Sequence, residues 1–291
     1  MVKTALNYSG PWCESPFALS ILDDKLANKE ITKFEFSQLS RFIRYGFVTI
    51  DLELTNEFIS DYKKEILNKI NTNLTTQQSG YHYSNSPRLF EAWKDCATVL
   101  DLCKNNKILN FLKLAYNRQP IPFQTINFIK GSNQPLHSDT IHFHTIPERW
   151  TTGVWVALED MDENNGTLQY VPRSHRLPAY TFQDLNLPVP KYGEEFENYH
   201  IYEQFLEDLV RAEKLNTNIL KCKAGTALVW AANLLYGGIP IVDNNRTRHS
   251  QAIHYYYEGC ETYYCPLYSD KYKGDWSLKD LSKKDILNHK I

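Results

Sequence analysis

The sequence lacks an excess of charge of either sign and any apolar run long enough to cross a membrane. Its 32 Lys and Arg residues nearly balance 34 Asp and Glu residues, which leaves a formal net charge of -2. A nucleic-acid-binding domain usually presents a basic stripe, and a transmembrane helix needs about 20 mostly apolar residues in a row. We therefore expect small-molecule partners, with no nucleic acid and no membrane among them.

The chain also lacks closely paired cysteines and an apolar leader. Its six Cys residues show no repeated close pair, and several stand among apolar residues, where a reduced thiol packs as a small hydrophobic group. Cys260 and Cys265 could form half of a zinc site, but no second pair follows them. The opening residues, Met1 to Thr4, include no apolar signal core. We expect six reduced thiols and a cytoplasmic location.

No internal repeat or low-complexity tract divides the 291 residues, so we expect one domain over residues 1–291. Residues 1–119 have mostly helical periodicity, after an irregular lead-in over residues 1–31. Helices are predicted over residues 34–45, ending at Gly46, then from Thr55 or Asn56 to Ile70, from Pro87 to Cys103, and over residues 108–115. A strand is predicted at residues 47–50. Residues 71–86 are predicted to be a loop that borders a site or simply connects two helices.

From Pro120 onward the pattern changes to short runs rich in β-branched and aromatic residues. The predicted strands are residues 124–129, 137–143, 153–161, 166–171, 218–222, 226–231 and 248–258. These runs predict a mainly β fold with flanking helices, a sandwich or jelly roll over residues 120–268. Residues 172–217 are predicted to be an excursion over the barrel mouth, with a helix at residues 201–214. Residues 269–291 form a polar tail, with a helix expected near residues 278–287.

Two short patterns carry the candidate chemistry. His137 and Asp139 are two residues apart on a predicted strand, so their side chains should share one face. An imidazole and a carboxylate so placed are two thirds of the facial triad of non-haem iron oxygenases. Arg248 and Ser250 have the same spacing in the last predicted strand, and an inward guanidinium with a hydroxyl would suit a carboxylate. The alternative for Arg248 is an outward side chain paired with a surface acid.

These residues together resemble the phytanoyl-CoA dioxygenase family of Fe(II)/2-oxoglutarate-dependent oxygenases, over most of residues 34–268. The matching segments are Pro122-Phe123-Gln124-Thr125, Leu136-His137-Ser138-Asp139-Thr140, Trp155-Val156-Ala157-Leu158-Glu159-Asp160, Asn165-Gly166-Thr167-Leu168, the Pro-x-Ser-His turn ending at His175, Ala224-Gly225-Thr226, Leu235-Tyr236-Gly237-Gly238 and Arg248-x-Ser250.

The resemblance implies a double-stranded β-helix with helices against its outside, and Fe(II) and 2-oxoglutarate as cofactors. It implies that His137 and Asp139 bind iron and act in catalysis, and that Arg248 binds the distal carboxylate of 2-oxoglutarate. Ser250, Thr140 and Trp155 are weaker candidates for contacts with the co-substrate. Trp155 and His175 could instead be structural, and for His175 we favour a structural turn. Asp139 argues against the halogenating relatives, which lack this carboxylate.

The chain departs from the family pattern at Tyr236, where the family has its third iron ligand, a His. A phenol titrates near pH ~10 and has to lose its proton to bind iron well. Tyr236 is therefore a ligand of an unusual site, or iron keeps two protein ligands and water, or the site is degenerate or mutated. Another His could substitute, among His142, His144, His249 and His254. His254 should face inward with Arg248, but lies some ~20 Å further along the strand at about 3.3 Å per residue.

We expect an oxygenase that hydroxylates a small polar metabolite with O₂ and releases succinate and CO₂. The polar residues that flank the predicted site favour a hydrogen-bonding substrate over a fatty acyl chain; they are His142, His144, Arg149, Tyr81, Tyr83 and Arg88. The alternative is an oxygenase fold that binds a ligand without catalysis. Tyr236 favours this alternative, whereas the other intact site residues favour the enzyme.

Overall fold

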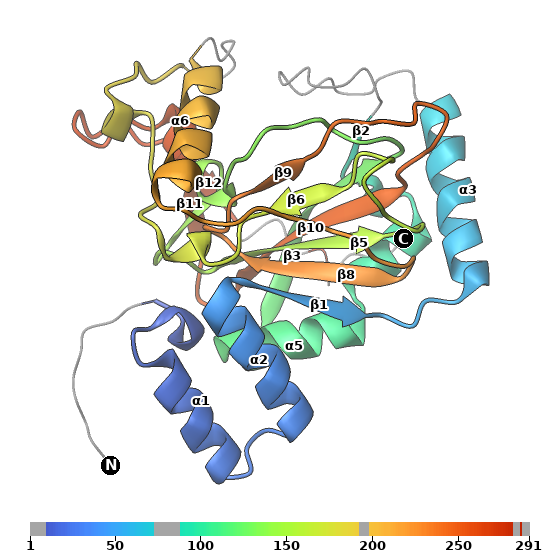
Figure 1. The fold of residues 1–291 in the computed structure, drawn as a ribbon, viewed down its shortest axis with the longest axis horizontal. Coiled ribbons are helices and arrows are strands. Elements are labelled where there is room, and N and C mark those ends of the chain that lie inside the picture. Colours follow the sequence, from blue (N-terminus) through green and yellow to red (C-terminus); the bar gives the residue numbers. More distant parts are fainter. Residues whose placement is uncertain (1–9, 73–87, 192–197, 282–285, 287–291) are drawn as a thin grey trace.

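Two stacked antiparallel sheets form the centre of the molecule (Figure 1). The computed structural model describes residues 10–72, 88–191, 198–281 and 286. The large sheet has the strand order β1 (Phe47–Asp51), β8 (Thr226–Ala231), β5 (Thr151–Ala157), β10 (Ser250–Tyr257), β3 (Pro120–Phe128) and β2 (Arg88–Phe90). The second sheet contains β7 (Asn218–Ile219), β6 (Leu168–Tyr170) and β9 (Tyr236–Gly238). A third sheet joins β12 (Leu278–Asp280), β11 (Thr262–Tyr264) and β4 (His144–Ile146).

The two faces of the large sheet have different neighbours because successive side chains of a strand point to opposite sides. On β5, Val154 and Val156 belong to the core shared with the N-terminal helices. Trp155 and Ala157 belong to a second core, shared with Leu168 and other residues of the small β7-β6-β9 sheet. The expected mainly β fold with helices outside a jelly roll is therefore confirmed, and its interior lies between the two sheets.

The helices cover the outside. They are α1 (Ala18–Ala27), α2 (Lys33–Tyr45), α3 (Asn56–Thr72), α4 (Ala97–Cys103), α5 (Asn106–Tyr116) and α6 (Tyr199–Ala212), with 3-10 turns at Trp12–Glu14, Ala92–Lys94, Asp139–Ile141, Ser174–Arg176, Gln183–Leu185 and Pro266–Tyr268. Figure 1 shows α1, α2 and α5 below the large sheet and α6 far from them, in the predicted excursion. None of the described helices is long and apolar enough to cross a membrane.

Helix α2 has clear start and stop signals. Thr32 and Glu35 form a capping box at its beginning, and Gly46 ends it with a left-handed backbone, φ 82°. A Cβ at Gly46 would also lie 2.5 Å from Nδ1 of His175. The predicted helix end is therefore correct, and the glycine additionally makes room for the turn that carries His175.

Two predictions for the N-terminal half are wrong. The irregular lead-in contains α1 and a 3-10 turn, because Ala18, Leu22 and Leu26 follow a helical spacing that places Ala18 and Leu22 in the core. The helix expected from Pro87 to Cys103 starts instead as strand β2, which pairs with β3, and is helical only in its second part. Partner strands are not visible in a local pattern, and here tertiary pairing decided the structure.

The last predicted helix, near residues 278–287, is partly wrong, since Leu278–Asp280 pairs with β11 as a strand. The predicted loop at residues 71–86 lies outside the described residues from position 73, together with Tyr81 and Tyr83. All six cysteines are free thiols, as expected.

Candidate active site

A cavity of about 190 Å³ lies between the large sheet and the β7-β6-β9 sheet. Its lining includes five of the seven candidate metal and co-substrate residues, His137, Asp139, Trp155, Tyr236 and Arg248. A larger hollow of about 830 Å³, between residues 183–191 and 268–277, contains none of them. The chemistry-bearing side chains therefore converge on the inner cavity.

His137 is held at the cavity through its backbone and its ring. Its amide and carbonyl exchange hydrogen bonds of 2.9 Å with those of Tyr236. Nδ1 donates to the Pro135 carbonyl at 2.9 Å, which leaves Nε2 as the acceptor, 3.3 Å from the Gln134 amide nitrogen. Burial lowers the pKa of His137, so the ring is neutral near pH 7. A neutral imidazole whose other nitrogen is held by a carbonyl is the form that binds metals.

Gly237 of β9 leaves no room for a side chain. A Cβ at Gly237 would lie 2.6 Å from the Gln134 carbonyl oxygen and 2.8 Å from the Pro135 carbonyl oxygen. The first glycine after Tyr236 thus allows β9 to approach the segment whose carbonyl orients His137.

Asp139 is an ionised carboxylate with three neighbours. Trp230 Nε1 donates to Oδ2 at 2.8 Å and the Tyr236 hydroxyl donates to Oδ1 at 2.7 Å. His254 Nε2 lies 3.5 Å from Oδ1. Burial alone would raise the pKa of Asp139, but His254, His137 and the Tyr236 hydroxyl together lower it to about 2. The carboxylate is therefore charged and available as a ligand at neutral pH.

The His-x-Asp pair does not lie on a regular strand, which corrects the prediction for residues 137–143. His137 forms an isolated bridge, Ser138 is extended with φ -119° and ψ 153°, and Asp139 begins a 3-10 turn. Both side chains still line the cavity, although the ion pair found for Asp139 among the described residues is with His254. Within these residues no three His, Cys, Asp or Glu side chains are already arranged to hold a metal ion.

Tyr236 is a neutral phenol that faces Asp139. Burial, and then the Asp139 charge, raises the pKa of Tyr236 well above its usual value. Its ring centroid is 4.5 Å from those of His137 and Trp230. Tyr236 thus lines the same cavity as His137 and Asp139, and it is a hydrogen-bond donor to Asp139 rather than a phenolate.

Arg248 points inward, so the surface alternative does not apply. It is 1% exposed, lies over the rings of Phe128 and Trp155, and donates from Nη1 to the Gly166 carbonyl at 3.1 Å. Its Nε has no hydrogen-bond partner, and none of the ion pairs among the described residues involves it. Burial, and then the charge of Arg88, lowers its pKa to about 9. A buried cation without an acid is costly unless an anion joins it.

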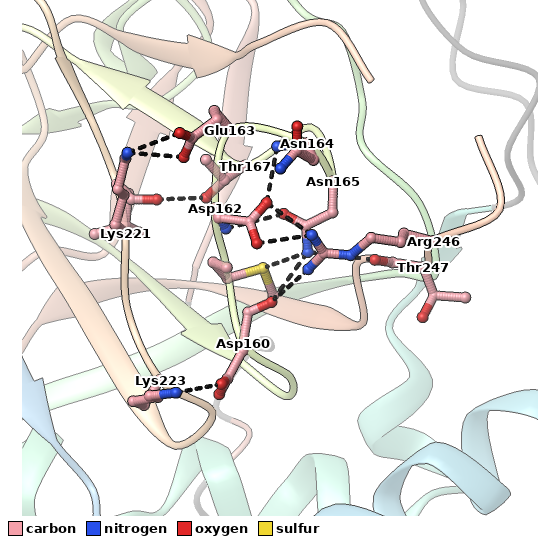
Figure 2. A network of polar contacts seen from close by, with 12 residues as sticks. Asp160, Asp162, Glu163, Asn164, Asn165, Thr167, Lys221, Lys223, Arg246 and Thr247 are labelled. Atoms are coloured by element: carbon pink, nitrogen blue, oxygen red, sulfur yellow. Dashed lines mark hydrogen bonds and ion pairs between the residues drawn. The ribbon is translucent and has the colours of Figure 1, made fainter. Parts of the chain in front are cut away.

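Figure 2 shows the polar contacts of Arg246 and Thr247, the two residues before Arg248 in the chain. Arg246 contacts both carboxylate oxygens of Asp162 at 2.7 Å, and the Asn165 amide donates to the carbonyls of Asp160 and Thr247. The Arg246–Asp162 ion pair is partly exposed and so stabilises the protein little, whereas Asn165 is buried. These contacts tie the residues before Arg248 to the loop whose Gly166 carbonyl accepts from it.

The weaker candidates have different places. Trp155 lines the cavity, and its indole N–H has no hydrogen-bond partner among the described residues. Ser250 is fully buried and donates to the Arg248 carbonyl at 3.3 Å, while Thr140 donates to Asn233 Oδ1 at 3.0 Å. Neither hydroxyl belongs to the cavity lining.

Of the flanking polar residues, His142 and Arg88 line the cavity. His144 pairs with Glu148, and Arg149 pairs with Glu14. Those two side chains lie outside the lining. His175 occupies the 3-10 turn at Ser174–Arg176, as expected for a structural residue.

Sequence reasoning missed Trp230 and the position of His254. Trp230 holds Asp139, and a Cβ at its cross-strand neighbour Gly153 would lie 2.2 Å from the Trp230 ring. A glycine inside a predicted strand is a signal for such a close approach. The prediction that His254 lies far from the site was wrong. It considered only the distance along β10 from Arg248, whereas Asp139 lies beside the His254 end of that strand.

Comparison with known proteins identifies a family and a relative for this chain. The family model described as Phytanoyl-CoA dioxygenase (PhyH) matches residues 51–250. An ectoine dioxygenase from Nocardia farcinica is 27% identical over 214 residues, which cover 69% of this chain and 70% of that protein.

Two solved structures show the same fold. The alpha ketoglutarate dependent carbocyclase SnoK from nogalamycin biosynthesis has a TM-score of 0.63 and 15% identity, over 81% of this chain and 87% of that one. EctD from S. alaskensis with bound Fe has a TM-score of 0.60 and 18% identity, over 78% and 77% of the two chains. Both likenesses confirm the predicted fold.

Proposed function

The chain belongs to the phytanoyl-CoA dioxygenase family, and from this premise we propose that it is an Fe(II)/2-oxoglutarate-dependent oxygenase. In this proposal it oxidises a small polar substrate with O₂. The observation that carries the proposal is Arg248, a buried cation without an acidic partner, in the same cavity as a neutral His137 and an ionised Asp139. One structure of EctD, a protein of this fold, contains Fe, and another contains 2-oxoglutarate and 5-hydroxyectoine. Iron and 2-oxoglutarate are the two cofactors proposed for this chain.

The donor set fits iron at two positions. His137 presents Nε2 to the cavity because its Nδ1–H is engaged by Pro135, and Asp139 supplies a charged oxygen. Imidazole and carboxylate donors with open positions beside them are typical of non-haem Fe(II) sites. Iron with 2-oxoglutarate supplies the activation of O₂, with succinate and CO₂ as co-products.

The remaining residues of the site bind 2-oxoglutarate, orient the binding groups and exclude water. Arg248 binds the distal carboxylate of 2-oxoglutarate with its guanidinium, and the Gly166 carbonyl fixes the direction of that guanidinium. Phe128 and Trp155 cover its faces and keep water from the ion pair, which strengthens it. Trp230 holds the Asp139 carboxylate in one rotamer.

A small substrate suits the dimensions of the site. The cavity of about 190 Å³ has to accept the co-substrate as well, which leaves little room for a long acyl chain. Gln124, Gln134, His142 and Arg88 add polar groups to the lining. These residues support a polar substrate that forms several hydrogen bonds.

One observation favours a second function, ligand binding without catalysis. The Tyr236 hydroxyl occupies Asp139 Oδ1 at 2.7 Å, so a metal ion competes with this hydrogen bond for the carboxylate. In that case Arg248 would bind an organic acid, and the protein would catalyse no reaction.

Replacement Tyr236→His separates the two functions. If the parent is an oxygenase limited by Tyr236, the variant gains iron affinity and faster conversion of 2-oxoglutarate to succinate, because an imidazole replaces a protonated phenol. A visible charge-transfer band of the Fe(III) parent that the variant lacks would identify a tyrosinate-bound site. No change in iron binding or succinate formation would mean that position 236 is not at the metal. A parent that binds 2-oxoglutarate but no iron would favour the non-catalytic function.

A further inference from the structure

His254 is a buried imidazole that forms an ion pair with Asp139. It lies on β10, is 3% exposed and lines the cavity, and neither ring nitrogen makes a hydrogen bond among the described residues. Its ring packs against Phe143, with centroids 4.9 Å apart. Buried polar groups are normally hydrogen-bonded, because leaving one unsatisfied costs roughly 1–3 kcal/mol. The ring of His254 therefore faces the cavity without a hydrogen bond, and its ion-pair partner Asp139 is on the same cavity, so a ligand could bind between the two side chains.

The position of His254 relative to Asp139 identifies the kind of ligand. Nε2 lies 3.5 Å from Asp139 Oδ1, longer than a normal hydrogen bond. Two donors that each bind one metal ion at about 2.1 Å lie roughly 3.0–3.4 Å apart, depending on the coordination geometry. The observed separation is close to that of two neighbouring ligands of one ion.

The spacing of residues along β10 leaves room for a molecule between Arg248 and His254. Arg248 and His254 are six residues apart and line the same cavity, with the small side chain of Ala252 between them. A molecule that bridges the guanidinium and a metal ion near Asp139 would cross the strand over Ala252. His254 thus stands at the metal end of the cavity and Arg248 at its anion end.

We propose that His254 is a metal donor of this site, together with His137 and Asp139, and that Tyr236 competes with the metal for Asp139 Oδ1 instead of binding it. This inference rests on the proposed function. It assigns the second imidazole of the site to β10, six residues after Arg248, rather than to the residue before the two glycines. Because the Tyr236 hydroxyl donates to Asp139 Oδ1, a metal ion bound to this oxygen would replace the Tyr236–Asp139 hydrogen bond.

The test is an anaerobic titration of the full chain with Co(II), read by calorimetry and by the visible absorption of the bound ion. His254→Gln should weaken Co(II) binding at least tenfold, whereas Tyr236→Phe should bind as tightly as the parent or more tightly. His249→Gln is the matched control, since His249 is also buried but its backbone amide is held by Glu159 outside the cavity. In His254→Ala, added imidazole should restore the absorption of the parent.

Three results would overturn the inference. Parent-like Co(II) affinity in His254→Gln would show that His254 does not bind the metal. A loss of binding in Tyr236→Phe would make the phenol the ligand. In both cases the proposed function survives. A folded parent that binds neither Co(II) nor Fe(II) would overturn the proposed function, and this inference with it.

Discussion

At the scale of single residues, burial sets the charge state that each group needs. The same desolvation that lowers the pKa of His137 would raise that of Asp139, and only its imidazole and hydroxyl neighbours reverse the direction there. One ring is therefore neutral and one carboxyl is charged over the same pH range. This is the combination that a metal ion can use without first removing a proton.

Arg248→Ala should abolish binding of 2-oxoglutarate while the protein stays folded. Loss of the charged partner of a buried carboxylate costs roughly 2–5 kcal/mol of binding free energy. Arg248→Lys, which keeps the charge but loses the planar fork, should give an intermediate affinity. Calorimetric titration of metal-loaded protein under nitrogen measures both.

The ligand-free Arg248→Ala protein should unfold at a temperature no lower than the parent, because the substitution removes a buried charge that has no acidic partner among the described residues. Unchanged affinity for 2-oxoglutarate in the alanine variant would remove Arg248 from the site.

Residue types and their order could be predicted from the sequence, but their neighbours could not. The chemistry of His137, Asp139 and Arg248 suggested a shared site, and all three line one cavity. The hydrogen bonds of Asp139 come from Trp230 and Tyr236, more than 90 positions later in the chain. Such contacts depend on how distant strands pair, which local periodicity does not reveal.

At the scale of elements, the site depends on a close contact between β5 and β8. Gly153 of β5 pairs with Trp230 of β8, and the absent side chain at Gly153 leaves room for the indole that holds Asp139. The strand over residues 226–231 was predicted with its observed bounds, because its short apolar run and the Gly225 before it are local signals. The segment around Asp139 was mispredicted because a single bridge to Tyr236, followed by a turn, replaces a strand.

Gly153→Ala should destabilise the fold by about 1–3 kcal/mol, since the added Cβ would lie 2.2 Å from the Trp230 ring and force it to move. It should also weaken metal binding, because Trp230 positions Asp139. Gly274→Ala is the control, as its Cβ would meet nothing within 4 Å and only its backbone φ of 73° is unfavourable. Denaturant unfolding and metal titration of both variants test this contact. Parent-like metal affinity in a destabilised Gly153→Ala would show that Trp230 does not position the carboxylate.

At the scale of the whole molecule, His175 joins the turn after β6 to the end of helix α2. Its Nε2 and the Arg176 guanidinium both donate to the Ile43 carbonyl, at 3.3 and 3.1 Å. Burial, and then the charge of Arg176, lowers the pKa of His175 to about 4. The structural role that we favoured from the sequence agrees with these contacts.

The free energy of unfolding should therefore fall as pH drops from about 6.5 to about 4, because in this window an unfolded His175 binds a proton that the folded one does not. The contribution of His175 is on the order of 3 kcal/mol at the lower end. His175→Gln should flatten this part of the stability curve, and the exposed His200→Gln should leave it unchanged. Equal slopes for the parent and His175→Gln between pH 4 and 6.5 would contradict the assignment.

The most direct test of the proposed function is an anaerobic crystal structure of the protein with Fe(II) and 2-oxoglutarate. We expect a metal ion bound by His137 and Asp139, and 2-oxoglutarate with one carboxylate on Arg248. The same map would show whether His254 or Tyr236 completes the protein ligands. A cavity that contains 2-oxoglutarate but no metal, or a metal ion bound away from His137 and Asp139, would contradict the assignment of this chain as an iron-dependent oxygenase.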